Sequence, residues 1–359
     1  MIRVTVYRIG VLYGDGIGPE ITKATVEVLE ASANKAGGVE FDWVKLPMGW
    51  EGIEKHGDPI PQVTKDELKK THGWLMGPHD SAAYPAQHQT NRNPSGELRH
   101  VFDLYSNIRP AKTMEGVQSV VGEADLVIVR ENTEGYYCDR NMVIGVGEWQ
   151  ITPDVVVSAG VFTRKAVERI AHTAFKMAMQ RRKKVTIVHK ANVIKLGTGL
   201  FLNVCREVGE QYPEVAVDDF HIDAMTAHLV RRAYFFDVIV TENMFGDILS
   251  DLAGELVGSL GLAPSINTSE DQAMAQAAHG SAPDIAGKNI ANPVGLMLST
   301  VMLLDWLANR HEDKRLIEVA RTMENGIFQA LAEGAKTRDL GGAASTTEFT
   351  QAVVERIAR

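Results

Sequence analysis

Cysteine is scarce in this chain: its 359 residues include only Cys138 and Cys205. Two cysteines are too few for a disulfide framework or for a zinc site built from cysteine thiolates. They fit a protein of the reducing cytoplasm, which is the location that we predict. We therefore expect neither a disulfide-rich secreted domain nor a cysteine-based zinc module.

Long apolar runs are also missing. The most apolar run covers residues 295–304 and is ended by Asp305, well short of the ~20 residues that a membrane span needs. We interpret this run as a buried helix. Residues 1–6 are typical of a strand and lack the long apolar core of a signal peptide. No membrane partner is expected.

An excess of positive charge is the third feature that the sequence lacks. The formal net charge is −9, which argues against nucleic acid as a partner. The apolar content of 45% and the charged content of 23% are ordinary for a globular protein, so a packed core is expected. The length is sufficient for two domains.

Strand-like runs alternate with longer helical patterns along the chain. The strand-like runs cover residues 4–12, 41–46, 73–76, 126–130, 185–189 and 237–241, and the helical patterns include 19–33, 164–180 and 199–211. This alternation predicts an α/β fold with a central, mostly parallel sheet. Residues 135–163 break the rhythm, with strand-like pieces at 143–146 and 155–157. We predict that they form an arm that pairs with another subunit.

The most informative stretch is Glu-Asn-Met-Phe-Gly-Asp-Ile-Leu-Ser-Asp at 242–251. Asp247 and Asp251 are four residues apart, which on a helix puts both carboxylates on one face. Ile248, Leu249 and Leu252 are expected to anchor the same turns in a core. Two like charges this close favour a cation between them, and Mg²⁺ or Mn²⁺ prefers such oxygen ligands. The alternative is a solvated acidic helix face.

Three arginines form a second group of candidates. Arg99 and Arg109 lie within one segment of 13 residues, 98–110, and Arg130 ends an apolar strand. An arginine at that place must be paired or must face a cleft. Guanidinium groups bind carboxylates through two parallel hydrogen bonds, so the three together indicate a di- or tricarboxylate substrate. Taken singly, each is more readily explained as an ion-pair residue.

Lys190 and Tyr137 are candidates for proton transfer. Lys190 follows an apolar strand, and a metal nearby would disfavour its charged form, which would make it a usable base. Tyr137 could supply a proton from the other face.

The loop 279–293, rich in turn residues and donors, could enclose an adenosine. Residues 14–18, Gly-Asp-Gly-Ile-Gly, lack the spacing of a dinucleotide fingerprint and are better explained by a tight turn that needs glycine.

These motifs together resemble the β-decarboxylating dehydrogenases, the family of isocitrate, 3-isopropylmalate, homoisocitrate and tartrate/D-malate dehydrogenases. The resemblance rests on residues 14–20, 130–135, 189–192, 243–251, 279–293 and 339–342. It implies two α/β domains and a nicotinamide site that is not of the Rossmann type. Residues 1–104 and 258–359 would form the cofactor-binding domain. Residues 105–257 would form the substrate and dimerisation domain, with an arm near 138–160.

The resemblance also implies roles for individual residues. The substrate would be a (2R,3S)-type 2-hydroxy acid with a 3-carboxylate, whose malate moiety is bound by Arg99, Arg109 and Arg130. Asp247 and Asp251 would ligate Mg²⁺ or Mn²⁺ together with the partner subunit's Asp223. The partner's Lys190 would handle the hydroxyl proton, and Tyr137 would protonate carbon after CO₂ leaves. A homodimer with shared active sites is implied, and a tetramer is compatible with it.

The same resemblance implies NAD as the cofactor. Asp284 takes the position that contacts the adenosine ribose, where a carboxylate accepts hydrogen bonds from free hydroxyls and repels a 2′-phosphate. Ile285 adds no charge there, whereas relatives that use NADP have Lys and Tyr. The remaining residues implied at the cofactor are His279, Gly280, Ser281, Ala282 and Asn292, the last of which would read the adenine.

The sequence departs from its relatives at the substrate pocket. Ser95 and Gly96 stand where isopropylmalate enzymes have paired leucines, and Asn93 and Ser95 exchange the polar types of isocitrate enzymes. A polar pocket favours isocitrate or homoisocitrate over tartrate or D-malate, and these over 3-isopropylmalate. Arg92 could meet a further carboxylate or lie at the surface. Gln276 replaces a glutamate that lies near the nicotinamide in relatives.

Two readings from other classes compete with the enzyme. A non-catalytic regulatory subunit would be expected to lose metal or proton-transfer residues, yet all of the candidate residues are present. A phosphate-binding α/β enzyme would use residues 14–18 instead. Protection by phosphate without any effect of NAD would favour that second reading.

Overall fold

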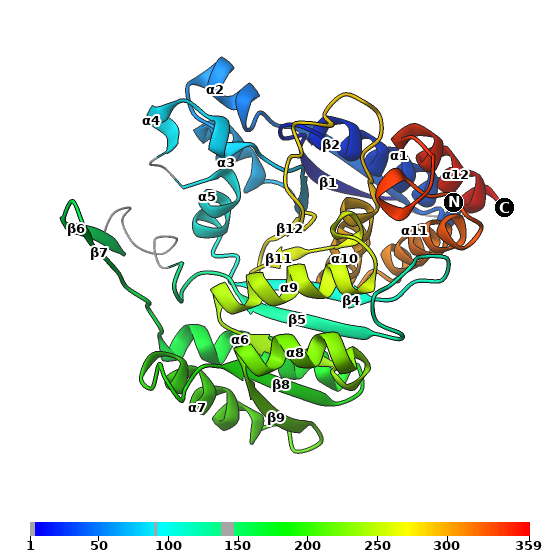
Figure 1. Ribbon diagram of the computed structural model, residues 1–359. Helices are drawn as coiled ribbons and strands as arrows, with labels where there is room; N and C mark the ends of the chain where they lie inside the picture. The colour runs from blue at the N-terminus through cyan, green and yellow to red at the C-terminus, as the bar shows by residue number, and fades with distance from the viewer. Residues whose placement is uncertain (1–3, 90–91, 138–146) are drawn as a thin grey trace.

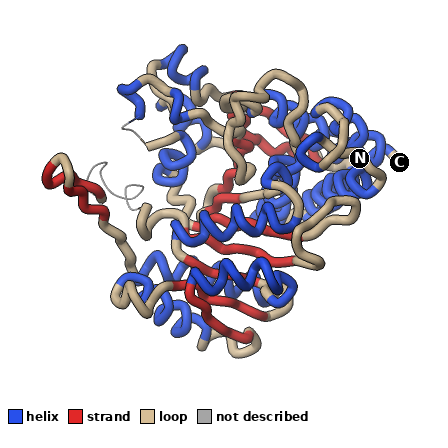
Figure 2. Tube along the Cα trace, viewed as in Figure 1, coloured by secondary structure: helices blue, strands red, loops and turns tan. Residues whose placement is uncertain are grey.

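A computed structural model describes residues 4–89, 92–137 and 147–359. Within this part of the chain a ten-stranded sheet runs through the molecule, in the order β2-β1-β3-β12-β11-β4-β5-β10-β8-β9 (Figures 1 and 2). Its strands are β1 (Thr5–Leu12), β2 (Val39–Lys45), β3 (Gly73–Met76), β4 (Ser106–Lys112), β5 (Asp125–Glu131), β8 (Lys184–His189), β9 (Ala216–His221), β10 (Val238–Thr241), β11 (Ile266–Thr268) and β12 (Ala273–Ala275).

The strands are mostly parallel, as the alternating pattern predicts. The antiparallel pairs are β11 with β12, β11 with β4, and β4 with β5. They lie in the middle of the sheet, where β4 and β5 belong to the predicted substrate domain and β11 and β12 to the predicted cofactor domain. The sheet is continuous across this place, and the division into two domains remains a prediction.

The longer helices cover the sheet in groups. They are α1 (Gly18–Ala36), α6 (Arg164–Met179), α7 (Gly197–Gly209), α8 (Ile222–Arg232), α9 (Asn243–Val257), α10 (Val294–His311), α11 (Lys314–Ala332) and α12 (Thr346–Ala358). One apolar core joins α1, α10, α11 and α12 to the sheet at the β1 end. At the other end, α6 and α7 share a core with β8 and β10, and α8 and α9 share another. The apolar run at 295–304 is buried in α10, as expected.

Shorter helices complete one edge of the molecule. They are α2 (Trp50–His56), α3 (Gln62–Leu68), α4 (Ala86–Gln89) and α5 (Pro94–Val101). The side chain of Asn93 caps α5 by accepting a hydrogen bond from the backbone N–H of Gly96 at 2.7 Å. This cap sets the start of the helix that carries Ser95 and Arg99.

A hairpin projects from the body, as Figure 1 shows. It consists of β6 (Glu148–Thr152) and β7 (Val155–Ser158), which pair with each other in an antiparallel manner. The strand expected at 155–157 is therefore present, whereas the strand expected at 143–146 lies outside the described residues. Trp149, Ile151 and Val156 are 48%, 61% and 61% exposed on this hairpin. In the described parts of the chain no helix is both long enough and apolar enough to cross a membrane.

Candidate active site

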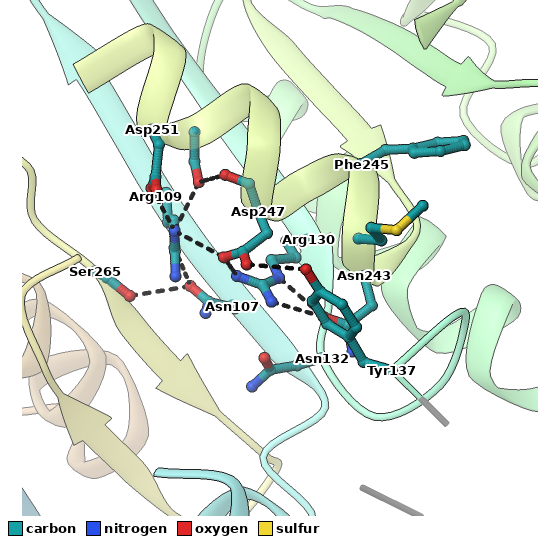
Figure 3. A network of polar contacts seen from close by, with 12 residues as sticks. Asn107, Arg109, Arg130, Asn132, Tyr137, Asn243, Phe245, Asp247, Asp251 and Ser265 are labelled. Atoms are coloured by element: carbon teal, nitrogen blue, oxygen red, sulfur yellow. Dashed lines mark hydrogen bonds and ion pairs between the residues drawn. The ribbon is translucent and has the colours of Figure 1, made fainter. Parts of the chain in front are cut away.

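Helix α9 carries the two aspartates of the motif. Glu242 caps its first turn, because its carboxylate accepts hydrogen bonds from the backbone N–H groups of Met244 and Phe245. Asp247 and Asp251 lie on one face of the helix, as their spacing predicts (Figure 3). Leu249 is fully buried beneath that turn, whereas Ile248 is 51% exposed. The expectation that Ile248 anchors the helix in the core was therefore wrong.

Two of the three arginines contact these aspartates. Arg109 on β4 lies between them, with Nη1 3.5 Å from Asp247 and 3.3 Å from Asp251 (Figure 3). Arg130 on β5 is 1% exposed and pairs directly with Asp247. The positive charge that two close carboxylates require is therefore supplied in part by the protein itself.

Neighbouring side chains hold these arginines in place. Asn243 accepts hydrogen bonds from Nε and Nη2 of Arg130 at 3.0 and 2.8 Å. Ser250 accepts one from Arg109 Nη1 at 2.7 Å. A Cβ at position 246 would lie 2.7 Å from the Cβ of Arg130, so only glycine allows α9 to pass so closely. These three residues stand inside the sequence motif, but their roles became visible only in three dimensions.

Tyr137 reaches the same place. Its hydroxyl donates a hydrogen bond to Asp247 Oδ2 over 3.4 Å, and its ring lies beside Arg130 (Figure 3). A phenol here could give a proton to a ligand bound between Asp247 and the arginines. The sequence expectation that Tyr137 belongs to the site is consistent with this position.

Lys190 and Asp223 are not part of the group of side chains around α9. Lys190 follows β8, Asp223 stands in the first turn of α8, and the two side chains form an ion pair. Among the described residues, no three or more His, Cys, Asp or Glu side chains are placed to hold one metal ion. One chain therefore brings together two of the three expected metal ligands, Asp247 and Asp251.

The charges around α9 are coupled. Burial raises the pKa of Asp251, the positive charge of Arg109 lowers it, and the charge of Asp247 raises it again. Burial also raises the pKa of Glu242 at the helix start to about 7, despite its two backbone hydrogen bonds. A divalent cation between Asp247 and Asp251 would relieve the repulsion that raises the pKa of Asp251, so their oxygen donors fit such an ion.

A polar cavity of ≈ 280 Å³ adjoins the arginines. Its lining includes the predicted substrate residues Asn93, Ser95, Arg99, Arg109 and Arg130, together with Asp247, His79 and Gln276. Arg92 is not among the lining residues; its side chain is 17% exposed and lies 3.8 Å from Glu97, so it is an ion-pair residue rather than a solvated surface one. The prediction that the substrate pocket is polar agrees with the side chains that line this cavity.

One wall of this cavity is a short hydrogen-bonded chain. Gln276 donates from Nε2 to Ser95 Oγ at 2.7 Å, and His79 Nε2 lies 3.0 Å from the same oxygen. Sequence reasoning missed His79, because residues 79, 95 and 276 come together only through the fold. The wall is polar and offers no apolar surface comparable to a pair of leucines.

A larger cavity of ≈ 520 Å³ lies next to the loop 279–293. His279, Gly280, Ala282, Ile285 and Asn292 line it, and Ser281 adjoins it through the hydrogen bond that its carbonyl accepts from Ile17. A Cβ at Gly16 would meet this carbonyl at 2.0 Å, which explains one glycine of the 14–18 turn. Asp284 is exposed and is not part of the lining.

The polar groups of the larger cavity differ in what they can still bind. His279 bonds through Nδ1 to its neighbour's carbonyl, while its buried Nε2 has no partner among the described residues. Burial lowers the pKa of this imidazole, so Nε2 is available as an acceptor. Asn292 already donates to Asp339 and accepts from the backbone of Val294. Of these two side chains, His279 has the open ring nitrogen, whereas the amide of Asn292 is already engaged through both its nitrogen and its oxygen.

Comparison with known proteins identifies the family of the chain. Residues 8–353 match the family model of the isocitrate/isopropylmalate dehydrogenases. The chain belongs to this family. Isocitrate/homoisocitrate dehydrogenase of Thermus thermophilus is 43% identical over 98% of both chains. 3-Isopropylmalate/3-methylmalate dehydrogenase of Methanocaldococcus jannaschii is 40% identical over 98% of this chain and 99% of its own.

A solved structure extends the agreement to the fold. Isocitrate dehydrogenase from Methylococcus capsulatus superposes with a TM-score of 0.88 at 38% identity, over 98% of this chain and 100% of that one. Membership of the family makes the chain an oxidoreductase that acts on a CH–OH group and decarboxylates its substrate, with a nicotinamide cofactor and a divalent metal. The relatives differ in substrate, so the family does not determine which hydroxy acid is used.

Proposed function

We propose that this protein is an NAD-dependent dehydrogenase that oxidises and decarboxylates isocitrate or homoisocitrate with Mg²⁺ or Mn²⁺. The observation that carries the proposal is the polar cavity where Arg99, Arg109 and Arg130 meet Asp247 of α9. Three guanidinium groups around one small cavity suit a substrate with more than one carboxylate.

The polar wall supports a substrate with a polar 3-substituent. Ser95 and Gln276 offer hydrogen bonds at the place where an isopropyl group would need apolar contact. The isocitrate/homoisocitrate dehydrogenase of Thermus thermophilus is among the relatives of highest identity. The alternative substrates are tartrate or D-malate, which also suit a polar wall, and 3-isopropylmalate, which suits it least.

We infer that the active site is shared between two copies of the chain. Asp247 and Asp251 of one copy would hold the metal together with the partner subunit's Asp223. The ion pair of Lys190 and Asp223 lies at the surface, with the Asp223 side chain 69% exposed. Apolar side chains are exposed around these elements, namely Val193 (66%), Leu196 (89%), Val230 (50%) and Ile248 (51%). Such a surface supports a homodimer that covers it.

Each side chain then has a task in the reaction. An ion held by Asp247, Asp251 and the partner subunit's Asp223 would supply polarisation of the substrate's hydroxyl and carbonyl oxygens, and a bound nicotinamide would accept the hydride. Arg109 and Arg130 orient the carboxylates and neutralise their charge. The partner's Lys190 takes the hydroxyl proton, and Tyr137 donates a proton to the carbon that loses CO₂.

NAD is the proposed form of the cofactor. Asp284 stands exposed beside Ile285 at the rim of the larger cavity, and a carboxylate there would repel a 2′-phosphate. His279 Nε2 offers a buried acceptor to the adenosine. The cytoplasmic location also remains a prediction.

The direct test is NADH formation by the purified protein with Mn²⁺, measured with isocitrate, homoisocitrate, D-malate, tartrate and 3-isopropylmalate. We expect the highest kcat/KM with isocitrate or homoisocitrate. A preference for 3-isopropylmalate would contradict the interpretation of the polar wall. No turnover with any of the five acids would favour the non-catalytic subunit instead.

A further inference from the structure

His189, the last residue of β8, is buried immediately before the proposed base Lys190. Its side chain is 3% exposed. Nδ1 of the ring accepts a hydrogen bond from the backbone N–H of Ala191 at 3.0 Å, and Nε2 lies 3.0 Å from Asp219 Oδ1. The imidazole of His189, the residue before Lys190, is therefore hydrogen-bonded to the backbone of Ala191, the residue after it.

This geometry determines the protonation state of the ring. A nitrogen that accepts an N–H carries no proton, so Nδ1 is bare and Nε2 carries the hydrogen that it donates to Asp219. Asp219 is held in turn by Arg206, which donates from Nη2 to Oδ2 at 2.6 Å. His189 is thus neutral, with one tautomer selected by contacts on both sides.

Further hydrogen bonds hold the backbone of the turn that carries Lys190. The backbone N–H of Lys190 donates to Thr198 Oγ1 at 3.2 Å, and its carbonyl accepts from Val193 and Ile194 at 3.0 and 2.8 Å. These bonds close a tight turn around Lys190. If the ring became positively charged, both of its nitrogens would be donors, and the contact with the N–H of Ala191 would become repulsive.

We propose that His189 is a positioning residue for Lys190, whose place in the turn depends on acceptance of the Ala191 N–H by Nδ1. The proposal rests on the proposed function, in which Lys190 takes the substrate's hydroxyl proton for the neighbouring copy. His189 touches no reacting atom in this account. It acts by keeping the amine of Lys190 at the distance that proton transfer needs.

The groups that face His189 are consistent with a neutral ring at neutral pH. Burial is the largest influence and lowers the pKa of the imidazole, Asp219 raises it, and His221 and Arg206 lower it. His221 lies opposite on β9, with its ring centroid 5.1 Å from that of His189.

Two substitutions separate the two ring nitrogens. In His189→Asn, the side-chain oxygen takes the place of Nδ1 and still accepts from Ala191, but it no longer titrates. In His189→Gln, the amide takes the place of Nε2 and still donates to Asp219, but the acceptor for Ala191 is lost. We expect kcat to fall less than about fivefold in the first variant and about 10²-fold in the second, as for a displacement of about 1 Å in a catalytic group.

Controls distinguish positioning from general loss of packing. His172→Asn removes another imidazole with a hydrogen bond, 2.9 Å to Tyr212, outside the site, and should leave kcat unchanged. Melting temperature and dimer content are measured for all variants. As the pH falls through the lowered pKa of His189, the wild type should lose kcat more steeply than His189→Asn, because only the wild type carries an imidazole at position 189 that can be protonated. Equal losses of kcat in the Asn and Gln variants, with parallel pH profiles, would overturn the proposal.

A measurement on the wild type does not depend on the variants. Nitrogen-15 NMR of labelled histidines should show one imidazole with a bare Nδ1 that stays neutral below the ordinary histidine pKa. The opposite tautomer at His189 would overturn the proposal. Lys190→Met separates it from the proposed function: full activity of that variant would refute the role of Lys190. Loss of activity there, with normal kcat in His189→Gln, would refute only the role of His189.

Discussion

Two groups of functional side chains differ in how completely one chain assembles them. Around α9, β4 and β5 the arginines are buried and held, and Arg109 touches both Asp247 and Asp251. At the ends of β8 and β9, Lys190 and Asp223 pair with each other at the surface instead. Under the proposed function, one folded chain would supply the carboxylate-binding arginines by itself, whereas the metal site and the proton acceptor would be completed only by a second copy.

The largest expected effect concerns the part that one chain assembles. Asp247→Asn keeps the shape of the side chain but removes the charge that faces Arg130 and the proposed metal. We expect kcat to fall about 10³-fold or more, because metal stabilisation of the transition state amounts to several kcal/mol. Steady-state kinetics across a Mn²⁺ titration measures the effect, and circular dichroism should show an intact fold. Normal turnover in the variant would remove Asp247 from the metal site.

A smaller effect is expected at the cofactor loop, away from both groups. The double substitution Asp284→Lys and Ile285→Tyr removes the repulsive carboxylate and adds a cation for a 2′-phosphate. We expect the ratio of kcat/KM for NAD to that for NADP to shift by about 10- to 100-fold towards NADP, the size typical of a charge-assisted contact of 1.5–3 kcal/mol. The single change Ile285→Val serves as the control. An unchanged ratio would mean that the ribose is recognised elsewhere.

The smallest effect is on stability, at the start of α9. The buried carboxyl of Glu242 has a pKa of about 7, above the ordinary value of 4.5, so the folded state holds its proton more tightly than the unfolded state. Its contribution to stability is full below pH 4.5 and is lost as the pH rises to about 7. Relative to Glu242→Gln, the wild type should lose up to about 3 kcal/mol of unfolding free energy over this range.

Urea unfolding of both proteins at pH 5 and pH 8 measures this difference. The comparison between the two proteins is needed because other carboxylates, such as Asp313 beside Arg315, have lowered pKa values. Their contribution to the unfolding free energy rises with pH, in the opposite direction to that of Glu242. A difference that is independent of pH would show that Glu242 is ionised in the folded protein at both pH values.

The sequence was sufficient for the parts of the fold that have strong apolar patterns. Strand β3 was predicted at its observed bounds, and β1, β5, β8 and β10 were predicted within one or two residues. Strands β4 and β9 were missed, because β4 contains Asn107, Arg109 and Pro110 and β9 contains Asp218 and Asp219. Their polar side chains serve the cavity and the surface, so they lack the apolar signal of a buried strand. Strands β11 and β12 have three residues each, too few for any pattern.

The candidate site was predictable wherever its residues share a local motif. The common face of Asp247 and Asp251 follows from their spacing alone, whereas the wall of His79, Ser95 and Gln276 joins three distant segments. Gln276 and Ser95 are 181 residues apart, and nothing local relates them. Ile248 was wrongly expected in a core: it is 51% exposed, on a surface that we propose a second subunit covers.

The most direct test of a shared site is a heterodimer of two inactive variants. Asp247→Asn and Lys190→Met chains, carrying different affinity tags, are co-expressed and purified as the mixed dimer through both tags. One of its two sites then combines a normal Asp247 with a normal Lys190, so we predict about half of the wild-type kcat per dimer. A mixed dimer as inactive as either parent would contradict the account, because both residues would then have to act within the same chain.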